Sequence, residues 1–470
     1  MTANLCFLSA VEAASFYRQG KISPVDVTSA CLDKIYKQNS ALNAFCLVDI
    51  SAAMEAARAS EARFSSQQEL GPLDGVPVAV KDLLLTKAWP TLKGSKTISV
   101  NQTWDDEAPS VSRLRESGAV LIGKTTTPEF GWKAVTDSPL TGITYNPWDM
   151  GRTAGGSSGG SAAALAAGMT LLALGSDGGG SIRIPASFTS TVGFKPTSGR
   201  VPLWPLSAFG TLAHHGPMAR TVQDIALTMD AIATYDRRDI YAVAGLEERF
   251  FDSVNKGIND LKIAFSANLG GSIVSHEVAT VIAHAIESYR KAGILFEATD
   301  PFKAFSPEII EETWRIHWLS GLLKISSSFP SEKMTDLDQG LLFLIQEAKK
   351  INLPQFLEAT SLRETLSLSL NEFFQYYDLL VTPTVAVPPF TAGLNTPKDL
   401  GFDHWWQWTP FTLPFNLTRH PAISIPCGLT VDGLPIGLQI VGRLGEDSLV
   451  LRAARVFELI LPFPKFPGQI

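Results

Sequence analysis

The sequence AGGSSGGSAAALAAG, residues 154–168, determines how the rest of this chain is interpreted. A flexible linker rich in glycine and serine would continue into polar sequence. Here the small residues are followed by SAAALAAGMTLLALG (161–175), which favours a helix and is apolar enough to be buried. The glycines therefore predict a tight loop at the entry to a core helix, where the backbone approaches a neighbouring group closely.

A second loop of small residues, GSDGGGSIRIP, occupies positions 175–185. We expect one buried helix between the two loops, so a chain that turns back on itself would bring serines of both loops close together. Serine hydroxyls are weak nucleophiles and need an adjacent proton acceptor. Neither loop contains a histidine, so the two serines require a different base.

Three familiar glycine-rich motifs fit these loops poorly. A phosphate-binding P-loop needs Lys and then Ser or Thr after its last glycine, and neither loop has them. A dinucleotide fingerprint needs G-x-G-x-x-G, which GGSSGG (155–160) does not provide. GGSSG (155–159) does match the G-x-S-x-G elbow of α/β-hydrolases. However, the preceding YNPWDMGRTA (145–154) is typical of a loop, whereas an elbow follows a strand.

Lys81 is the candidate base. It ends the apolar run VPVAV (76–80), so its side chain would start from the end of a buried strand. Burial lowers the pKa of a lysine by up to several units, and the neutral amine can then accept a proton. The alternative is an ordinary lysine whose amine reaches solvent from a strand end.

Short apolar segments alternate with helical segments along the chain, which favours an α/β fold with a sheet covered by helices on both faces. A mostly helical section at about 301–370 is expected to shape a pocket, and residues 1–470 are expected to form one domain. Strands are expected at 76–80, 120–125, 261–267, 376–387, 422–428 and 432–442, and helices at 110–119, 221–233 and 276–293, with two more within 9–39.

Composition and charge exclude several classes of protein. The chain has 470 residues, is 45% hydrophobic and 18% charged, and has a formal net charge of -7. Its charges are interspersed, so we expect no surface for nucleic acid. Because it has no apolar run of about 18 residues and no signal peptide, we expect a cytoplasmic protein without membrane attachment. Histidines and cysteines are scattered singly, so no metal site is expected.

Several segments together resemble the amidase signature family: GGSSGGSAAALAAG, LALGSDGGGSIRIPASF and VGFKPTSGRVP. GPLDGVPVAVKDLL, SGAVLIGKTTTPEFG, TGITYNPWD and PFNLTRHPAISIPCGLTVDGLPIGLQIVG are similar to further family segments and occur in the family order. The resemblance covers nearly the whole chain and is weakest between about 240 and 370. It implies the amidase signature fold, a large twisted mixed β-sheet covered by helices on both faces, and an amidase activity without a cofactor.

The resemblance also implies roles for single residues. Lys81 matches the general base, Ser157 the bridging serine that follows a cis peptide bond, and Ser181 the nucleophile that is acylated. The remaining residues implied by the resemblance are the oxyanion-hole N–H donors Gly178, Gly179, Gly180 and Ser181, the supporting residues Ser158, Asp177 and Arg183, and the substrate contact Gly131.

Two features leave the substrate open. Gly178 stands where the family often has Thr or Ile, which implies a looser oxyanion loop or a larger acyl pocket. The aromatic segment FDHWWQWTPFTLPF (402–415) is either core or the rim of the pocket.

His214 and His215 are expected to be structural, because a relay of one lysine and two serines needs no imidazole.

Three functions stay open at this point. The first is a stand-alone amidase that hydrolyses a small carboxylic amide to carboxylate and ammonia or amine through an acyl-enzyme on Ser181. The second is the glutaminase component of a tRNA-dependent amidotransferase, which works with a partner subunit. The third is an α/β-hydrolase with a Ser-His-Asp triad. The segment DHWWQWTPFT (403–412) favours the first function, for which the resemblance is compatible with a homodimer.

Overall fold

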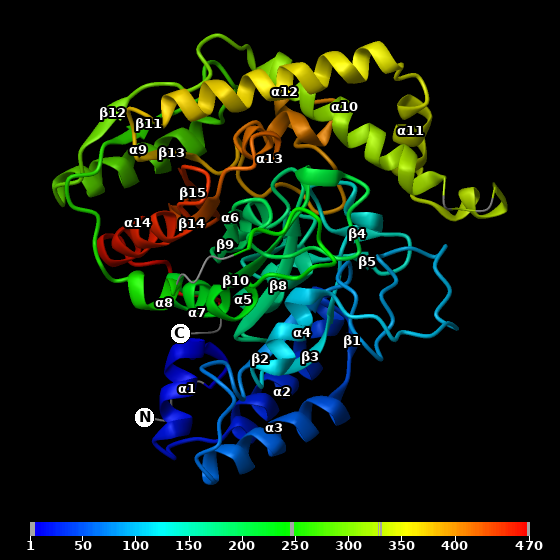
Figure 1. Cartoon of the computed structure of the whole chain (residues 1–470), viewed down its shortest axis with the longest axis vertical. Coiled ribbons are helices and arrows are strands. Elements are labelled where there is room, and N and C mark those ends of the chain that lie inside the picture. The colour runs from blue at the N-terminus through cyan, green and yellow to red at the C-terminus, as the bar shows by residue number, and fades with distance from the viewer. Residues whose placement is uncertain (1–4, 245–248, 328, 330, 468–470) are drawn as a thin grey trace.

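An 11-stranded sheet runs through the molecule (Figure 1), whose computed structural model describes residues 5–244, 249–327, 329 and 331–467. The strand order is β1-β3-β2-β8-β10-β9-β14-β15-β13-β11-β12. Strands from both halves of the chain pair in this one sheet, and a single domain remains our proposal. The strands are β1 Phe45–Val48, β2 Pro77–Lys81, β3 Val120–Thr125, β8 Leu172–Asp177, β9 Val192–Lys195, β10 His214–Ala219, β11 Ile263–Phe265, β12 Phe296–Ala298, β13 Leu379–Pro383, β14 Ala422–Leu429 and β15 Pro435–Gly442.

The sheet is mixed, as the resemblance implied. β2 pairs in parallel with β3 and β8, and β11 pairs in parallel with β12 and β13. The pairs that lead from β8 through β10, β9, β14 and β15 to β13 are antiparallel, as is the pair of β1 and β3. Two short hairpins lie outside the sheet: β4 Asp137–Ser138 with β5 Gly142–Ile143, and β6 Tyr145–Asn146 with β7 Asp149–Thr153.

Helices cover both faces of this sheet (Figure 1). α7, α9 and α14 contact strands from one face, and α5 and α6 contact strands from the other. Within the described ranges, no helix is both long and apolar enough to span a bilayer. The helices are α1 Ala10–Arg18, α2 Pro24–Leu42, α3 Ile50–Ser65, α4 Pro109–Glu116, α5 Gly159–Ala166, α6 Arg183–Thr189, α7 Val222–Ile232, α8 Phe250–Ser253, α9 His276–Lys291, α10 Pro307–Ser326, α11 Gln339–Ala348, α12 Leu353–Phe373, α13 Leu413–Leu417 and α14 Asp447–Ile460.

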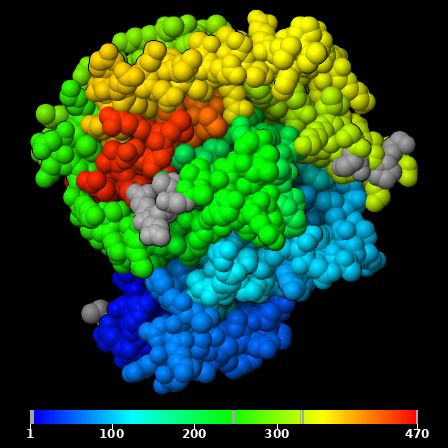
Figure 2. All heavy atoms as spheres, in the orientation of Figure 1, coloured from blue at the N-terminus to red at the C-terminus, as the bar shows by residue number. Residues whose placement is uncertain are grey.

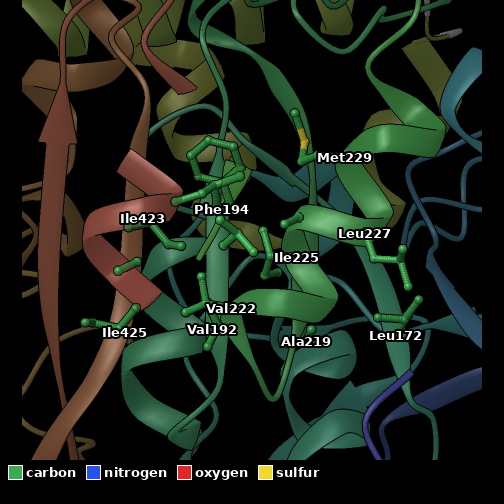
Figure 3. Packing of buried hydrophobic residues seen from close by; sticks show 14 of the residues in the cluster. Leu172, Val192, Phe194, Ala219, Val222, Ile225, Leu227, Met229, Ile423 and Ile425 are labelled. Atoms are coloured by element: carbon green, nitrogen blue, oxygen red, sulfur yellow. The ribbon is translucent and has the colours of Figure 1, made fainter. Parts of the chain in front are cut away.

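The two faces bury alternate residues of each strand, as the period of two in a β-strand requires. In β2, Val78 and Val80 belong to the core that contains α7 and α14, whereas Ala79 belongs to the core that contains α5. Figure 3 shows the first of these cores, in which Phe194 of β9 and Ile225 of α7 pack together. The sheet is therefore buried on both sides, which explains its continuous apolar strands.

The N-terminal helices begin where the sequence indicates. Ser9 before α1 and Ser23 before α2 each form a capping box with the acidic residue three positions later. Pro24 occupies the first turn of α2, where its missing N–H has no intrahelical partner to lose. These helices form one end of the molecule, shown in dark blue in Figure 2.

The segment between the two glycine-rich loops differs from the expectation. It is not one helix: α5 is followed by strand β8, which pairs in parallel with β2. Gly168 adopts φ +72 shortly after α5 ends, a conformation that interrupts a helix. The apolar run after it suits a buried strand as well as a buried helix, so periodicity alone could not separate the two.

The section at about 301–370 is helical, as expected. It contains α10, α11 and most of α12, with a 3₁₀ helix at Ser331–Asp336. Positions 328 and 330 of this section lie outside the described residues. Figure 2 shows the section in yellow-green and yellow, at the end of the molecule opposite the N-terminal helices. Its helices contact one another and α13, and they share a hydrophobic core with residues of β11, β13, β14 and β15.

Candidate active site

Lys81 lies at the end of β2, on the face of the sheet that α5 covers. Side chains alternate between the faces of a strand, so Lys81 points to the same face as Ala79, which packs in the core with α5. Ser157 and Ser158 lie directly before α5. The Lys81 Nζ atom lies 2.6 Å from Ser157 Oγ and 2.9 Å from Ser158 Oγ. The strand and the helix entry therefore bring three of the predicted residues into contact.

The environment of Lys81 favours its neutral form. Its side chain is fully buried, and Nζ also lies 3.0 Å from Ser176 Oγ. Burial lowers the pKa of Lys81 well below the ordinary value of a lysine, against the opposing effect of the Asp177 charge. In the described part of the chain, neutral hydroxyls and not carboxylates lie in hydrogen-bond contact with this amine. A buried neutral amine of this kind can act as a base.

The two glycine-rich loops meet at this point. The backbone N–H of Ser158 donates to the carbonyl oxygen of Ser181 over 3.1 Å. The peptide bond between Gly156 and Ser157 is cis, as the resemblance implied. A Cβ atom on Gly156 would lie 2.5 Å from the backbone of Val135, so only glycine fits there. The close backbone approach expected from the small residues is therefore present.

Ser157, Ser181 and Gly131 line one cavity of about 340 Å³, a size typical of sites for small molecules. Gly131 has φ +72, and a Cβ atom there would lie 3.3 Å from Ser157 Oγ. A side chain at this position would therefore enter the space beside the serine. Most of the cavity wall is apolar and includes Leu83, Leu85, Phe130, Leu203, Phe209 and Trp318.

The loop at 178–181 presents backbone N–H groups near Ser181. Within the described residues, the N–H groups of Gly178, Gly179 and Ser181 have no hydrogen-bond partner. Gly180 differs, because its N–H donates to Asp177 Oδ1 over 2.7 Å. This donor is already used within the loop, so the Gly180 N–H is not free to bind an oxyanion.

Two residues that sequence reasoning missed hold this loop from outside. The indole N–H of Trp314 donates to the carbonyl oxygen of Gly178 over 3.0 Å, and Thr412 Oγ1 donates to the carbonyl oxygen of Gly179 over 2.7 Å. Trp314 is 136 positions away from Gly178, and Thr412 is 233 positions away from Gly179. No local pattern connects such distant residues, so only the folded chain shows them.

The expected looseness at Gly178 is not what the structure shows. A Cβ atom on Gly178 would lie 2.9 Å from the ring of Trp318, and one on Gly179 would lie 2.7 Å from the ring of Trp314. The two tryptophan rings stack on each other at 4.9 Å. The space that a side chain at Gly178 would take is therefore filled by a rigid aromatic wall, and the loop is closely packed.

Asp177 and Arg183 form a buried ion pair beneath the loop, with Arg183 Nη2 3.0 Å from Asp177 Oδ1. Burial alone would raise the pKa of Asp177, but the Arg183 guanidinium outweighs it and holds this pKa well below the ordinary value. Arg183 also donates to Asn416 Oδ1 over 2.6 Å and to Gln439 Oε1 over 2.8 Å. Sequence analysis did not predict these two partners, which connect the loop to α13 and β15.

His214 and His215 lie close to the site, and His214 Nδ1 is 3.3 Å from the carbonyl oxygen of Asp177. Among the described residues, no histidine forms a hydrogen bond with Ser157 or Ser181. Nδ1 of His214 lies 2.9 Å from the carbonyl oxygen of Leu212. His215 lines the cavity, but burial and the nearby Lys81 lower its pKa to about 3. The arrangement therefore does not support a Ser-His-Asp triad.

The aromatic segment at 402–415 is core. Trp405, Trp406 and Trp408 are buried, and the described residues of this segment do not line the cavity. The Trp405 ring packs edge to face against the Trp314 ring, with 5.2 Å between their centroids, so it helps to hold Trp314 in place. Among the described residues, no group of three histidine, cysteine, aspartate or glutamate side chains is close enough to hold a metal ion.

Comparison with known proteins gives a consistent result. The family model described as Amidase matches residues 26–451. An acylamidase of Rhodococcus erythropolis is 36% identical over 98% of this chain and 97% of its own length. A glutamyl-tRNA(Gln) amidotransferase subunit of Myxococcus xanthus is 33% identical over 96% of both chains.

Solved structures agree with this result. A bacterial aryl acylamidase of the amidase signature family superimposes with a TM-score of 0.90 at 30% identity, covering 97% of this chain and 96% of its own. The substrate complex of 6-aminohexanoate cyclic dimer hydrolase superimposes with a TM-score of 0.85 at 27% identity, covering 97% of this chain and 98% of its own. The expected α/β fold is thus confirmed by structures that match it over nearly its whole length.

Proposed function

The chain belongs to the amidase family and is a hydrolase of amide carbon–nitrogen bonds, and from this premise we propose that Lys81, Ser157 and Ser181 perform the reaction. The observation that supports the proposal most directly is the 2.6 Å contact between the buried Lys81 Nζ and Ser157 Oγ. A lysine kept neutral by burial accepts the proton of a serine that bridges it to the nucleophile.

The acylation step follows from this arrangement. Lys81 takes the proton of Ser157 while Ser157 takes the proton of Ser181, and Ser181 Oγ attacks the amide carbonyl carbon. The proton then returns through Ser157 to the nitrogen of the leaving amine, the carbon–nitrogen bond breaks, and the acyl group stays on Ser181. Water attacks this ester with the same base, which releases the carboxylate and restores Ser181.

Backbone donors stabilise the negative charge that develops on the carbonyl oxygen. We assign this role to the N–H groups of Gly178, Gly179 and Ser181, which have no other partner in the described part of the chain. Each preorganised donor of this kind contributes about 100-fold or more to the rate. Asp177 and Arg183 act by fixing the loop, and Ser158 acts by its contact with the Lys81 amine.

The apolar cavity supports a small carboxylic amide as the substrate, as the name of the acylamidase relative also suggests. The alternative is glutaminase activity within an amidotransferase, because several relatives are subunits of that enzyme. The acylamidase is 36% identical to this chain, against 33% and 34% for two of these subunits. We therefore favour the amidase that acts without a partner subunit, and we propose a cytoplasmic homodimer as its working form.

The test compares the purified wild type with Ser181→Ala on anilides, aliphatic amides, amino-acid amides and glutamine. We expect release of amine or ammonia from apolar amides, and its loss in Ser181→Ala. Turnover of glutamine alone, and only with a copurifying subunit, would favour the alternative. Turnover that persists in Ser181→Ala would refute the assignment of the nucleophile. Light scattering of the same preparation gives the oligomeric state.

A further inference from the structure

One charged side chain of the active-site cavity has no function in the mechanism. Lys93 lines the cavity together with Ser157, Ser181 and Gly131. It lies in a turn after β2, and its backbone carbonyl accepts a hydrogen bond from the N–H of Phe130 over 2.8 Å. Phe130 directly precedes Gly131, where a Cβ atom would lie 3.3 Å from Ser157 Oγ. The Lys93 side chain therefore starts from a point close to the reacting serines.

The Lys93 amine lacks a carboxylate of its own. The acidic group whose charge affects it is Asp82, whose Oδ1 lies 3.7 Å from the amine of the buried Lys124. The charge of this one carboxylate thus acts on two lysines. In the described residues, the Lys93 amine forms no hydrogen bond and no ion pair.

The remaining charges of the cavity do not compensate for Lys93. Asp177 is the one carboxylate among the described lining residues, and it is paired with Arg183. Lys324 of α10 adds a second cation at the exposed side of the cavity. Burial lowers the pKa of Lys93, and the charge of Asp82 opposes this shift. A half-buried amine of this kind gains more from a bound anion than an amine in water does.

We propose that the cavity recognises an amide that carries a carboxylate, and that Lys93 binds this carboxylate while the apolar wall binds the rest of the substrate. The proposal rests on the proposed function, because it assumes that the amide reacts at Ser181. Lys93 is then a residue that determines specificity. Lys324 assists it from the solvent side, where water screens its charge more strongly.

The test uses two pairs of substrates with equal shape. Glutaric acid monoanilide is compared with 5-methylhexananilide, and N-butanoyl-β-alanine with N-(3-methylbutyl)butanamide, so that a branched alkyl group replaces the carboxylate on the acyl or on the amine side. We expect the wild type to prefer the carboxylate in at least one pair by about 10-fold or more in kcat/KM, as a charge-assisted hydrogen bond provides.

Variants assign that preference to Lys93. Lys93→Met should raise KM for the preferred carboxylate substrate by about 10- to 100-fold, with kcat little changed and the neutral partner unaffected. Lys93→Arg should keep the preference. Lys96→Met is the matched control, because Lys96 lies on the same segment but is exposed and lines a different hollow. Unchanged turnover of the neutral amide shows that each variant is folded.

The outcomes separate this proposal from the proposed function. No discrimination in either pair, or a preference that Lys93→Met leaves unchanged, overturns the role of Lys93 while Ser181-dependent hydrolysis stands. Absence of Ser181-dependent turnover of every amide refutes the proposed function itself. An equal loss in Lys93→Met and Lys96→Met would show a general effect of surface charge and would also overturn the proposal.

Discussion

Trp314 donates its indole N–H to the carbonyl oxygen of Gly178 over 3.0 Å. That carbonyl and the N–H of Gly179 belong to one planar peptide unit, so the orientation of one fixes the orientation of the other. Trp314 lies on α10 and is fully buried. The helical section thus sets the direction of the Gly179 N–H, which we propose as an oxyanion donor, and Trp314 is a positioning residue for it.

Trp314→Phe keeps most of the ring and removes the donor. We expect kcat to fall about 10-fold, the effect of one hydrogen bond of ordinary strength, because the Gly178–Gly179 peptide is then free to tilt. KM for an apolar amide should change by less than about 3-fold, since the ring still fills its place. Steady-state kinetics with a single anilide measures both constants.

Trp405→Phe is the matched control for this variant. The Trp405 ring also packs against Trp314, but its indole N–H has no hydrogen-bond partner among the described residues. Its replacement should leave kcat within about 2-fold of the wild type. If both variants lose the same activity, the effect comes from packing of the aromatic cluster and not from the bond to Gly178.

The activity should depend on pH through Lys81. Burial lowers the pKa of this amine, and protonation below that pKa removes the base. We therefore expect kcat/KM to fall as the pH decreases, and Lys81→Met to show no activity at any pH. His215, whose pKa is lowered to about 3, should not contribute above pH 5. A flat acid limb with chemistry rate-limiting would contradict the role of Lys81.

Lys81 should also make stability depend on pH in a defined direction. The lysine binds a proton more readily in the unfolded chain than in the fold, so unfolding takes up protons between the two pKa values. The contribution of Lys81 to the stability of the wild type should therefore rise with pH up to the ordinary pKa of lysine, about 10.4. Urea unfolding of wild type and Lys81→Met at several pH values isolates this effect, because other buried lysines are common to both. A difference in unfolding free energy that does not vary with pH would mean that Lys81 is charged in the fold.

Much of the local structure could be predicted from the sequence. The strand that ends at Lys81 and the helices that Ser9 and Ser23 cap are encoded in a few neighbouring residues, by apolar runs and by capping side chains. Local signals also led to one wrong prediction. The apolar run after Gly168 suits a strand and a helix equally, and the helix predicted there is the strand β8 in the structure.

The surroundings of the site could not be predicted in this way. The loop at 178–181 and the neighbouring Asp177 form hydrogen bonds with Trp314, Thr412 and Asn416. Each of these three residues is more than 130 positions away from its partner in the sequence. Such contacts depend on how α10 and α13 pack over the sheet, and packing leaves no periodic pattern in a single sequence. Gly178 illustrates the limit, since its small size has a physical reason only once Trp318 is known to lie beside it.

Loss of the ion pair beneath the loop should cost stability. In Arg183→Met the carboxylate of Asp177 loses its buried partner, so we expect a loss of about 3–5 kcal/mol in the free energy of unfolding. The pKa of Asp177 is held low in the fold, so its stabilising effect is present above about pH 4 and fades only below that pH. In Arg183→Met the guanidinium no longer opposes the effect of burial, which then raises the pKa of Asp177, so the loss measured by urea unfolding should be smaller at pH 5 than at pH 8. Asp177→Asn combined with Arg183→Met should recover part of the loss, and a loss below about 1 kcal/mol would contradict a tight pair.

Gly178→Ala tests whether the aromatic wall determines the size of the oxyanion loop. Gly178 is not among the glycines with positive φ, so its backbone accepts alanine and the effect must come from contact. The added Cβ would lie 2.9 Å from the ring of Trp318, which stacks on Phe209 at 3.8 Å and on Trp314 at 4.9 Å and therefore has little room to move. Overpacking of this kind costs about 1–3 kcal/mol. We expect lower stability and at least a 10-fold lower kcat, because the loop moves away from the reacting carbonyl.

In Gly178→Ala combined with Trp318→Leu the smaller side chain makes room for the Cβ, so kcat should recover relative to Gly178→Ala alone. If Gly178→Ala is as active as the wild type, the ring yields and the wall does not hold the loop.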